Sequence, residues 1–303
     1  MEAVEFYLPH LKAQNQTCSV EDLVAEMLRV KQADGASRRY LNDIRSRLGQ
    51  FAETFTGRAT SDVAGDEVDD WLRDLKGRKG QSISAVGRNN FRRLLIVAFN
   101  YAVSRGYCAD NPAVTSAKAK EIEGTVGILS VKQTADLLAK ADSELVPFLA
   151  IGAFAGLRRA ELERLDWSEV DLAGGLIEVV ASNAKSARRR FVKIRKNLKA
   201  WLNPYAIRSG NVTPKDFRQR LDDARVAATI GDWPNNALRH GFASYTLAAE
   251  NDAAALALEL GHTNSNLVFQ HYRQIVKPKD AKAYWNITPS AEASGKVVAY
   301  LAC

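Results

Sequence analysis

The sequence predicts a mainly α-helical protein, in which an N-terminal helical bundle is followed by a mostly helical domain with a small antiparallel β-sheet. The chain has 303 residues, and domains commonly hold about 100–200 residues each, so two domains are expected. Apolar residues recur at helical spacing along most of the chain, and only two short segments have the pattern of paired strands.

The composition is that of a globular protein with a basic surplus. Apolar residues make up 46% and charged residues 25%, which is enough apolar material to bury a core. The net charge is +7 and the pI is near 9.3. Lys and Arg side chains release counterions from a phosphate backbone, so this charge suits a nucleic acid partner, although many unrelated proteins are equally basic.

Cysteine usage and apolar runs set further expectations. Cys18, Cys108 and Cys303 are odd in number and lack the short spacings of a zinc site, so we expect no disulfide framework and no metal. The chain begins without the basic and apolar segments of an export signal, and nowhere do about 18 apolar residues run together. We therefore expect a cytoplasmic protein without a membrane partner.

The N-terminal domain is expected over residues 19–113, after a segment 1–18 that shows no clear period and is interpreted as an arm or docking segment. Apolar spacing and cap residues predict four helices, one beginning at Ser19 and three spanning 36–55, 66–75 and 84–105. Gly106 is placed to end the fourth helix as its C-cap.

Three arginines lie on one side of the fourth helix, namely Arg88, Arg92 and Arg93. Their spacing places them along one edge that suits phosphate groups, and a solvated surface is the alternative.

Residues 114–127 lack apolar periodicity and are expected to link this bundle to a second domain over 128–290, which a tail of 291–303 follows. Segments 176–180 and 191–194 have strand patterns and are expected to pair as a hairpin. Helices are predicted over 130–140, 145–154, 159–165, 198–201, 214–225, 236–249, 252–260 and 267–276.

Arginine, histidine and tyrosine recur in the second domain at spacings that core packing does not require. These residues lie in Gly156–Leu162, Asn236–Tyr245, Leu260–His262 and His271–Arg273, with Lys185 between the first two segments. In this order they resemble the active site of the tyrosine recombinase (phage integrase) family, which cuts and rejoins DNA through a phosphotyrosine.

The end of the N-terminal bundle resembles the core-binding, SAM-like domain of the same family. The resemblance is carried by Tyr101–Val103, Gly106–Tyr107 and Asn111–Ala113. With the second domain as the tyrosine recombinase catalytic domain, the resemblance extends from about residue 19 to residue 290.

Arg158 and Arg239 are the candidates for holding the scissile phosphate. Substitution at a phosphodiester places extra charge on the non-bridging oxygens, and an always-protonated guanidinium fork stabilises it. Glu161, one helical turn after Arg158, would hold that guanidinium, and a surface arginine in a helix salt bridge is the alternative. Arg239 lies in an apolar helix, where an unpaired charge is costly, so it should face a cleft.

The resemblance implies the other catalytic roles. Lys185 would protonate the departing 5′-oxygen as general acid, and His262 would donate to a phosphate oxygen. Tyr272 would be the nucleophile, assisted by neighbouring cations because a phenol is weakly nucleophilic at its pKa of about 10. The competing Tyr245 lies in an apolar helix and is interpreted as a core residue.

Arginines next to Lys185 are expected to contact backbone phosphates of DNA. They are Arg188, Arg189 and Arg190.

Asn236 departs from the family pattern, because many recombinases have histidine at this position, three residues before the arginine. Asparagine can hydrogen-bond to phosphate or to the tyrosine hydroxyl but cannot take a proton. The proton of Tyr272 must pass to water or another group, or activity is slowed or lost. His240 and His271 each adjoin a key position but point about 100° around a helix from it, so neither is a simple replacement.

The resemblance implies a site-specific recombinase that clamps double-stranded DNA between two domains and forms a 3′-phosphotyrosine without ATP, metal or other cofactor. It implies a nucleoid-associated protein that is a homo-tetramer on synapsed DNA and a monomer or dimer when free. Residues 284–287 would dock onto a neighbouring protomer or pack on their own domain.

Three alternatives follow from the same residues. A type IB topoisomerase uses similar chemistry, but the integrase-like N-terminal bundle argues against it. A DNA-binding protein that has lost catalysis is supported by Asn236. A helical interaction protein without a nucleic acid role would show no salt-dependent DNA binding.

Overall fold

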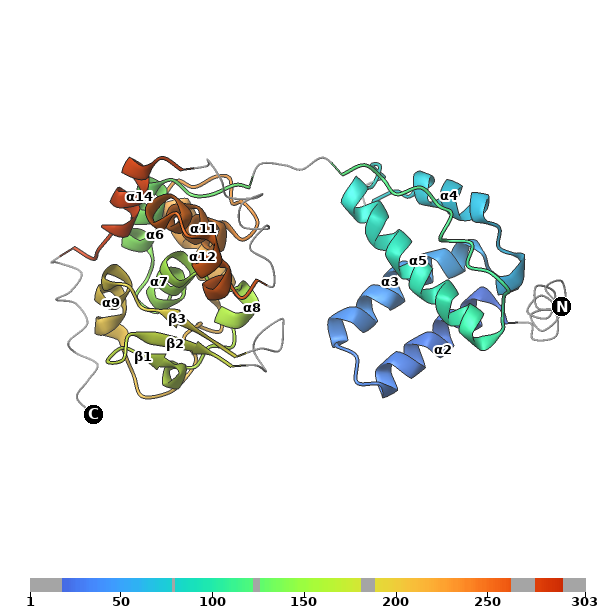
Figure 1. The fold of residues 1–303 in the computed structure, drawn as a ribbon, viewed down its shortest axis with the longest axis horizontal. Coiled ribbons are helices and arrows are strands. Elements are labelled where there is room, and N and C mark those ends of the chain that lie inside the picture. Colours follow the sequence, from blue (N-terminus) through green and yellow to red (C-terminus); the bar gives the residue numbers. More distant parts are fainter. Residues whose placement is uncertain (1–17, 78–79, 122–125, 181–188, 263–275, 291–303) are drawn as a thin grey trace. The chain divides into compact units, whose positions relative to one another are not determined.

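The structure is a computed structural model that describes residues 18–77, 80–121, 126–180, 189–262 and 276–290. It separates the chain into two compact units, Met1–Glu123 and Gly124–Cys303 (Figure 1). Within the described residues, no helix is both long and apolar enough to cross a membrane.

The first unit contains the four predicted helices. They are α2 (Val20–Ala33), α3 (Arg38–Thr54), α4 (Gly65–Asp74) and α5 (Ala85–Arg105), with a short 3-10 turn, η1 (Thr60–Asp62), before α4. The side chains of Ser19, Ser37 and Ser84 accept hydrogen bonds from the first turns of α2, α3 and α5. Gly106 ends α5 at φ 77°, a conformation that glycine adopts without steric cost.

The core of this unit is aromatic and aliphatic. The ring of Phe51 lies edge-on to Trp71 and Phe99, with centroid distances of 5.0 and 5.9 Å. The apolar stripe of α5 is therefore core, as its spacing predicts.

The first part of the expected linker is fixed to α5. The amide of Asn89 donates to the carbonyl of Ala119 at 2.9 Å and accepts from the backbone N–H of Ala119, also at 2.9 Å. Arg92 donates through Nε to the carbonyl of Ser116 at 2.9 Å. Residues 114–121 are therefore attached to the bundle, which spacing alone did not predict.

The second unit contains the other elements. They are α6 (Val131–Lys140), α7 (Val146–Ala155), α8 (Arg159–Leu162), η2 (Trp167–Glu169), β1 (Val170–Asp171), β2 (Leu176–Val179), β3 (Arg190–Lys193), α9 (Lys196–Leu202), η3 (Asn203–Tyr205), α10 (Phe217–Ala227), α11 (Ala237–Glu250), α12 (Ala253–Leu260) and α14 (Pro278–Trp285). The long apolar helix α7 is buried along its whole length and packs against α9 and α11 (Figure 1).

The sheet has the order β1-β2-β3 and is antiparallel throughout. Ile177 pairs with Val192, and both side chains are buried, whereas Glu178 and Phe191 pair on the other face. The predicted hairpin is therefore present in the register that its alternation implies. The third strand, β1, is two residues long and was not predicted.

Helix α14 packs within its own unit. Tyr284 is 1% exposed, its ring stacks on that of Tyr245 at 3.9 Å, and its hydroxyl donates to the carbonyl of Ala153 at 2.6 Å. Trp285 lies edge-on to Phe242 at 6.0 Å. Of the two alternatives for residues 284–287, the structure shows packing on their own unit, because Tyr284, Trp285 and Ile287 pack in its core.

Candidate active site

The turn after α7 places Arg158. Gly156 ends α7 at φ 63°, and a Cβ atom there would lie 2.3 Å from Cδ1 of Phe242 on α11. Both the backbone conformation and the close approach of α11 therefore require glycine. Two residues later Arg158 is the N-cap residue of the short helix α8.

Glu161 holds Arg158 in two ways. One carboxylate oxygen accepts from the backbone N–H of Arg158 at 2.8 Å, and the other accepts from Nη1 of the same residue at 2.9 Å. The predicted pairing of Glu161 with Arg158 is present, and the backbone contact also caps α8.

Glu161 is a buried carboxylate with a second arginine partner. The residue is 2% exposed, and its two oxygens accept from Nη1 and Nη2 of Arg190 at 3.0 and 2.7 Å. Burial raises the pKa of this carboxyl, but hydrogen bonds from Arg190 and from the amide of Arg158 outweigh it, so the pKa is lowered overall. Glu161 is therefore a carboxylate at neutral pH.

Arg239 is 7% exposed and is satisfied by backbone oxygens. Its Nη1 donates to the carbonyl of Gly156 at 2.7 Å, and its Nη2 donates to the carbonyl of Leu260 at 2.7 Å. The same Nη2 lies 3.1 Å from Nε2 of His262. Arg239 thus joins the end of α7 to the end of α12, as expected of a charge on a buried helix face.

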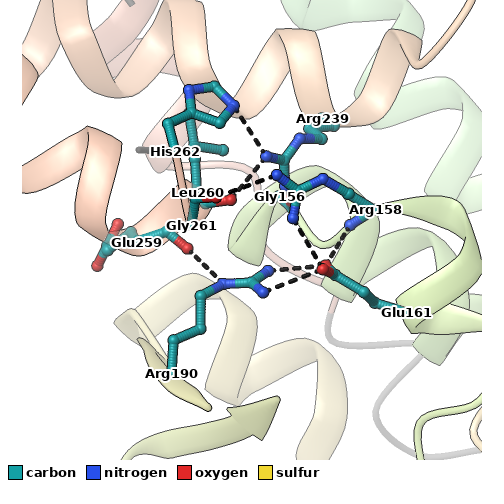
Figure 2. Close-up of polar contacts among 9 residues, drawn as sticks. All are labelled: Gly156, Arg158, Glu161, Arg190, Arg239, Glu259, Leu260, Gly261 and His262. Carbon is teal, nitrogen blue, oxygen red and sulfur yellow. Dashed lines mark hydrogen bonds and ion pairs between the residues drawn. The ribbon is translucent and has the colours of Figure 1, made fainter. Parts of the chain in front are cut away.

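His262 is placed by the end of α12. Gly261 follows the helix at φ 64°, and the backbone N–H of His262 donates to the carbonyl of Ala257 at 2.9 Å. Figure 2 shows that this turn brings the imidazole beside the Arg239 guanidinium, with Arg158 on the same side of the turn.

Three consecutive carbonyl groups at the end of α12 accept from three different arginines (Figure 2). The carbonyl of Glu259 accepts from Arg190 at 2.9 Å, that of Leu260 from Arg239 at 2.7 Å, and that of Gly261 from Arg158 at 3.2 Å. The last carbonyl groups of a helix have no hydrogen-bond partner within the helix itself, and the C-terminus of a helix favours positive charge. The helix end therefore gathers the guanidinium groups.

This arrangement can hold an oxyanion. Three guanidinium groups lie in the cluster with one carboxylate, Glu161, so positive charge is in excess, and an imidazole lies beside them. Fixed, permanently charged donors in a partly buried site stabilise a developing negative charge better than mobile surface groups do.

Asn236 lies one helical turn before the buried arginine and has an unusual backbone. It is the N-cap residue of α11 at φ 55° and ψ 29°, and its exposed side chain makes no capping hydrogen bond. With Arg239 it lines a cavity of about 180 Å³, whose other walls include Phe148 and Trp233. The structure thus places Asn236 beside the cluster.

Tyr245 is a core residue, as predicted. Its hydroxyl donates to the carbonyl of Leu129 at 3.0 Å. Burial, with a smaller contribution from Asp280, raises the pKa of Tyr245 to about 12. A buried phenol that resists ionisation is unsuited to attack a phosphate. The other predicted catalytic residues, Lys185 and Tyr272, lie outside the described residues.

The arginines predicted to contact DNA have different surroundings. On α5, Arg93 is exposed beside Asn90, Arg88 is half-buried, and Arg92 is occupied by the backbone of residues 114–116. On the hairpin, Arg189 is 60% exposed, pairs with Glu178 and lies over the ring of Phe191. Arg188 lies outside the described residues.

Arg190 requires a correction. Its side chain is 10% exposed, and its guanidinium is taken up by Glu161 and by the carbonyl of Glu259, so it lies within the cluster and lacks the exposure that the predicted DNA contact needs. The basic run 188–190 concealed this role. Strand alternation could have shown it, because Arg190 shares the inward face with the buried Val192.

The chain is similar to known proteins in sequence and in fold. Residues 129–278 match the model of the phage integrase family. The tyrosine recombinase XerC of a Pseudomonas putida strain is 29% identical over 203 residues, 57% of this chain and 67% of that protein. The XerC of a Pseudomonas fluorescens strain is 26% identical over 284 residues, 82% of this chain and 90% of that protein.

A solved structure shares the fold. A phage lambda integrase dimer bound to a core site superposes with a TM-score of 0.68 at 16% identity, covering 87% of this chain and 81% of that one. The matched segment contains the three arginines and the histidine of the cluster. The chain belongs to the phage integrase family of tyrosine recombinases.

Proposed function

We propose that this protein is a site-specific DNA recombinase that cleaves and rejoins duplex DNA through a 3′-phosphotyrosine on Tyr272. The observation that carries the proposal is the cluster of Arg158, Arg239 and His262 around the end of α12. Its donors suit the non-bridging oxygens of a phosphodiester under attack.

The reaction follows from the chemistry of a phosphodiester. The Tyr272 hydroxyl gives its proton to water or another group, and its oxygen attacks phosphorus. The bond from phosphorus to the 5′-oxygen breaks, and Lys185 supplies a proton to the departing oxygen. One ester bond is exchanged for another, so the step needs no ATP. A 5′-hydroxyl from a second duplex can reverse it, which joins strands from two DNA molecules.

The proposed partners follow from the same step. Strand exchange between two duplexes requires several protomers, so we propose a homo-tetramer on synapsed DNA and a monomer or dimer without DNA. The net charge of +7 supports binding to the phosphate backbone. Such a protein would act at the nucleoid in the cytoplasm.

A second function, DNA binding without cleavage, is favoured by one observation. Asn236 lines a cavity together with Arg239 and stands where many recombinases have a histidine, and an amide cannot accept the proton of Tyr272.

The two functions are distinguished by the fate of DNA after denaturation. We would incubate the full-length protein with sheared DNA of its own genome and measure DNA that stays attached to denatured protein, for wild type and Tyr272→Phe. A recombinase gives attached DNA only with Tyr272. Binding that weakens with salt in both proteins, without any attached DNA, would instead identify a protein that only binds.

A further inference from the structure

Two of the three arginines at the end of α12 have roles in holding phosphate, and the third does not. Arg190 is 10% exposed and makes its contacts with protein groups, so it cannot be assigned to a phosphate of DNA. Its contacts reach Glu161 and the end of α12 (Figure 2).

The contacts of Arg190 join β3, α8 and α12. Its Nη1 and Nη2 donate to the two oxygens of Glu161 at 3.0 and 2.7 Å, and its Nε donates to the carbonyl of Glu259 at 2.9 Å. Its Cδ packs against Gly261, where a Cβ atom would lie only 3.1 Å away. One planar side chain therefore bridges a buried carboxylate and a helix end.

Glu161 is shared between two arginines, and this sharing leaves Arg158 bound to the carboxylate through only one guanidinium nitrogen. Arg158 gives Glu161 one guanidinium nitrogen, Nη1, while its Nη2 contacts the carbonyl of Gly261 at 3.2 Å. If Arg190 were absent, the buried carboxylate would have Arg158 as its remaining cation and would draw that guanidinium into a two-point pair.

We propose that Arg190 is a positioning residue for strand cleavage, which holds Glu161 and the last turn of α12 together so that Arg158 and Arg239 present their guanidinium groups to the phosphate. This role rests on the proposed recombinase function. Arg190 begins β3 opposite Val179 in the strand register, and it follows Lys185 in the sequence by five residues. It therefore also ties the strand that follows Lys185 to the phosphate site.

The test compares the rate of Tyr272-dependent DNA attachment across a range of pH. The variants are Arg190→Met and the double variant Arg190→Met/Glu161→Gln. Arg220→Met is a matched control, because Arg220 is also partly buried and pairs with Asp142, Glu144 and Asp216 away from the cluster. Thermal unfolding and DNA affinity are measured for each protein.

We expect Arg190→Met to cleave on the order of 100-fold more slowly at neutral pH, since small displacements of positioned groups have effects of that size. DNA affinity should stay within a few-fold of wild type, and Arg220→Met should cleave as wild type does.

The pH profile separates positioning from general loss of structure. Without Arg190, the pKa of the buried Glu161 carboxyl rises, so the acid side of the profile shifts toward neutral pH. The charged and titratable groups near Glu161 are Arg158 at the start of α8, Arg190 from β3, Arg239 from α11, and His262 after α12. His262 is present in every variant, so it does not cause a difference between them. Adding Glu161→Gln to Arg190→Met should remove the shift of the pH profile and recover most of the cleavage rate that Arg190→Met loses.

The outcomes are distinct. If wild type cleaves and Arg190→Met cleaves at the same rate, the positioning role is overturned. It is also overturned if Arg190→Met loses the same fraction of the cleavage rate at every pH and Glu161→Gln does not restore it. Wild type without Tyr272-dependent attachment overturns the proposed function and this role with it. If Arg190→Met does not fold, Arg190→Lys serves instead, because an ammonium can hold one carboxylate oxygen but not Glu259 as well, and an intermediate rate with the same pH shift is expected.

Discussion

At the scale of single residues, the candidate site depends on side chains that are satisfied before DNA arrives. Arg239 has two backbone acceptors at 2.7 Å, and Arg158 has a carboxylate and a carbonyl. Guanidinium groups fixed in this way need little reorganisation when a phosphate binds, which is the main benefit of a preorganised site. Asn236 differs from them, because its exposed side chain makes no capping contact.

Asn236→His should raise the cleavage rate at neutral pH by at least about tenfold, because an imidazole can accept the proton of Tyr272 and an amide cannot. The free energy of unfolding should change by less than about 1 kcal/mol, since histidine tolerates positive φ and no side-chain contact is lost. Rates of covalent attachment and thermal unfolding check both parts. Asn236→Gln is the control, since it keeps an amide, and an equal rate in all three proteins would contradict the role given to this position.

At the scale of elements, the strongest predictions from sequence were those with a repeated physical signal. The serine caps and apolar stripes of α2, α3 and α5 are visible without any structure, and so is the alternation that pairs β2 with β3. Strand β1 is too short for a period to show. Helix α14 begins at Pro278 and has charged residues in its first turns, so its buried face contains only Ala281 and Tyr284. So short an apolar face shows no clear period in the sequence.

The candidate site was predicted from a different signal. The order of the Arg, His and Tyr segments and their family resemblance pointed to Arg158, Arg239 and His262, which the structure brings together. Contacts made through backbone oxygens, such as those of Glu259 and Gly261, have no signature in the sequence, because any residue supplies a carbonyl. The role of Arg190 depends on those contacts and on strand register, so the basic run alone pointed to a solvated surface.

The contact of α11 with α14 should make the second unit sensitive to alkali. Burial raises the pKa of Tyr245 to about 12, against 10.0 for an unperturbed tyrosine, and it raises the pKa of the stacked Tyr284 also. The folded state therefore prefers the neutral phenols, and this stability is complete below about pH 10 and is lost as pH rises toward 12. The midpoint of thermal unfolding should fall over this interval.

Tyr245→Phe provides the comparison for that measurement. The variant lacks one titrating phenol, so its unfolding midpoint should fall less steeply between about pH 10 and pH 12 than that of wild type. Parallel curves for the two proteins would show that Tyr245 does not contribute to the alkaline loss.

At the scale of the whole molecule, two compact units and a basic charge are combined in one chain. The second unit carries the proposed phosphate site, and the first carries exposed basic side chains such as Arg93. Clusters of fixed arginines bind many anions. The proposed recombinase function requires that the anion is a DNA phosphate and that Tyr272 attacks it.

The most direct measurement is the identity of the residue that becomes linked to DNA. After reaction with DNA, denaturation, nuclease digestion and proteolysis, mass spectrometry of the peptides would locate any nucleotide left on the protein. We expect a nucleotide joined through its 3′-phosphate to the peptide that contains Tyr272. A nucleotide on Tyr245 or another residue, or linkage through a 5′-phosphate, would contradict it.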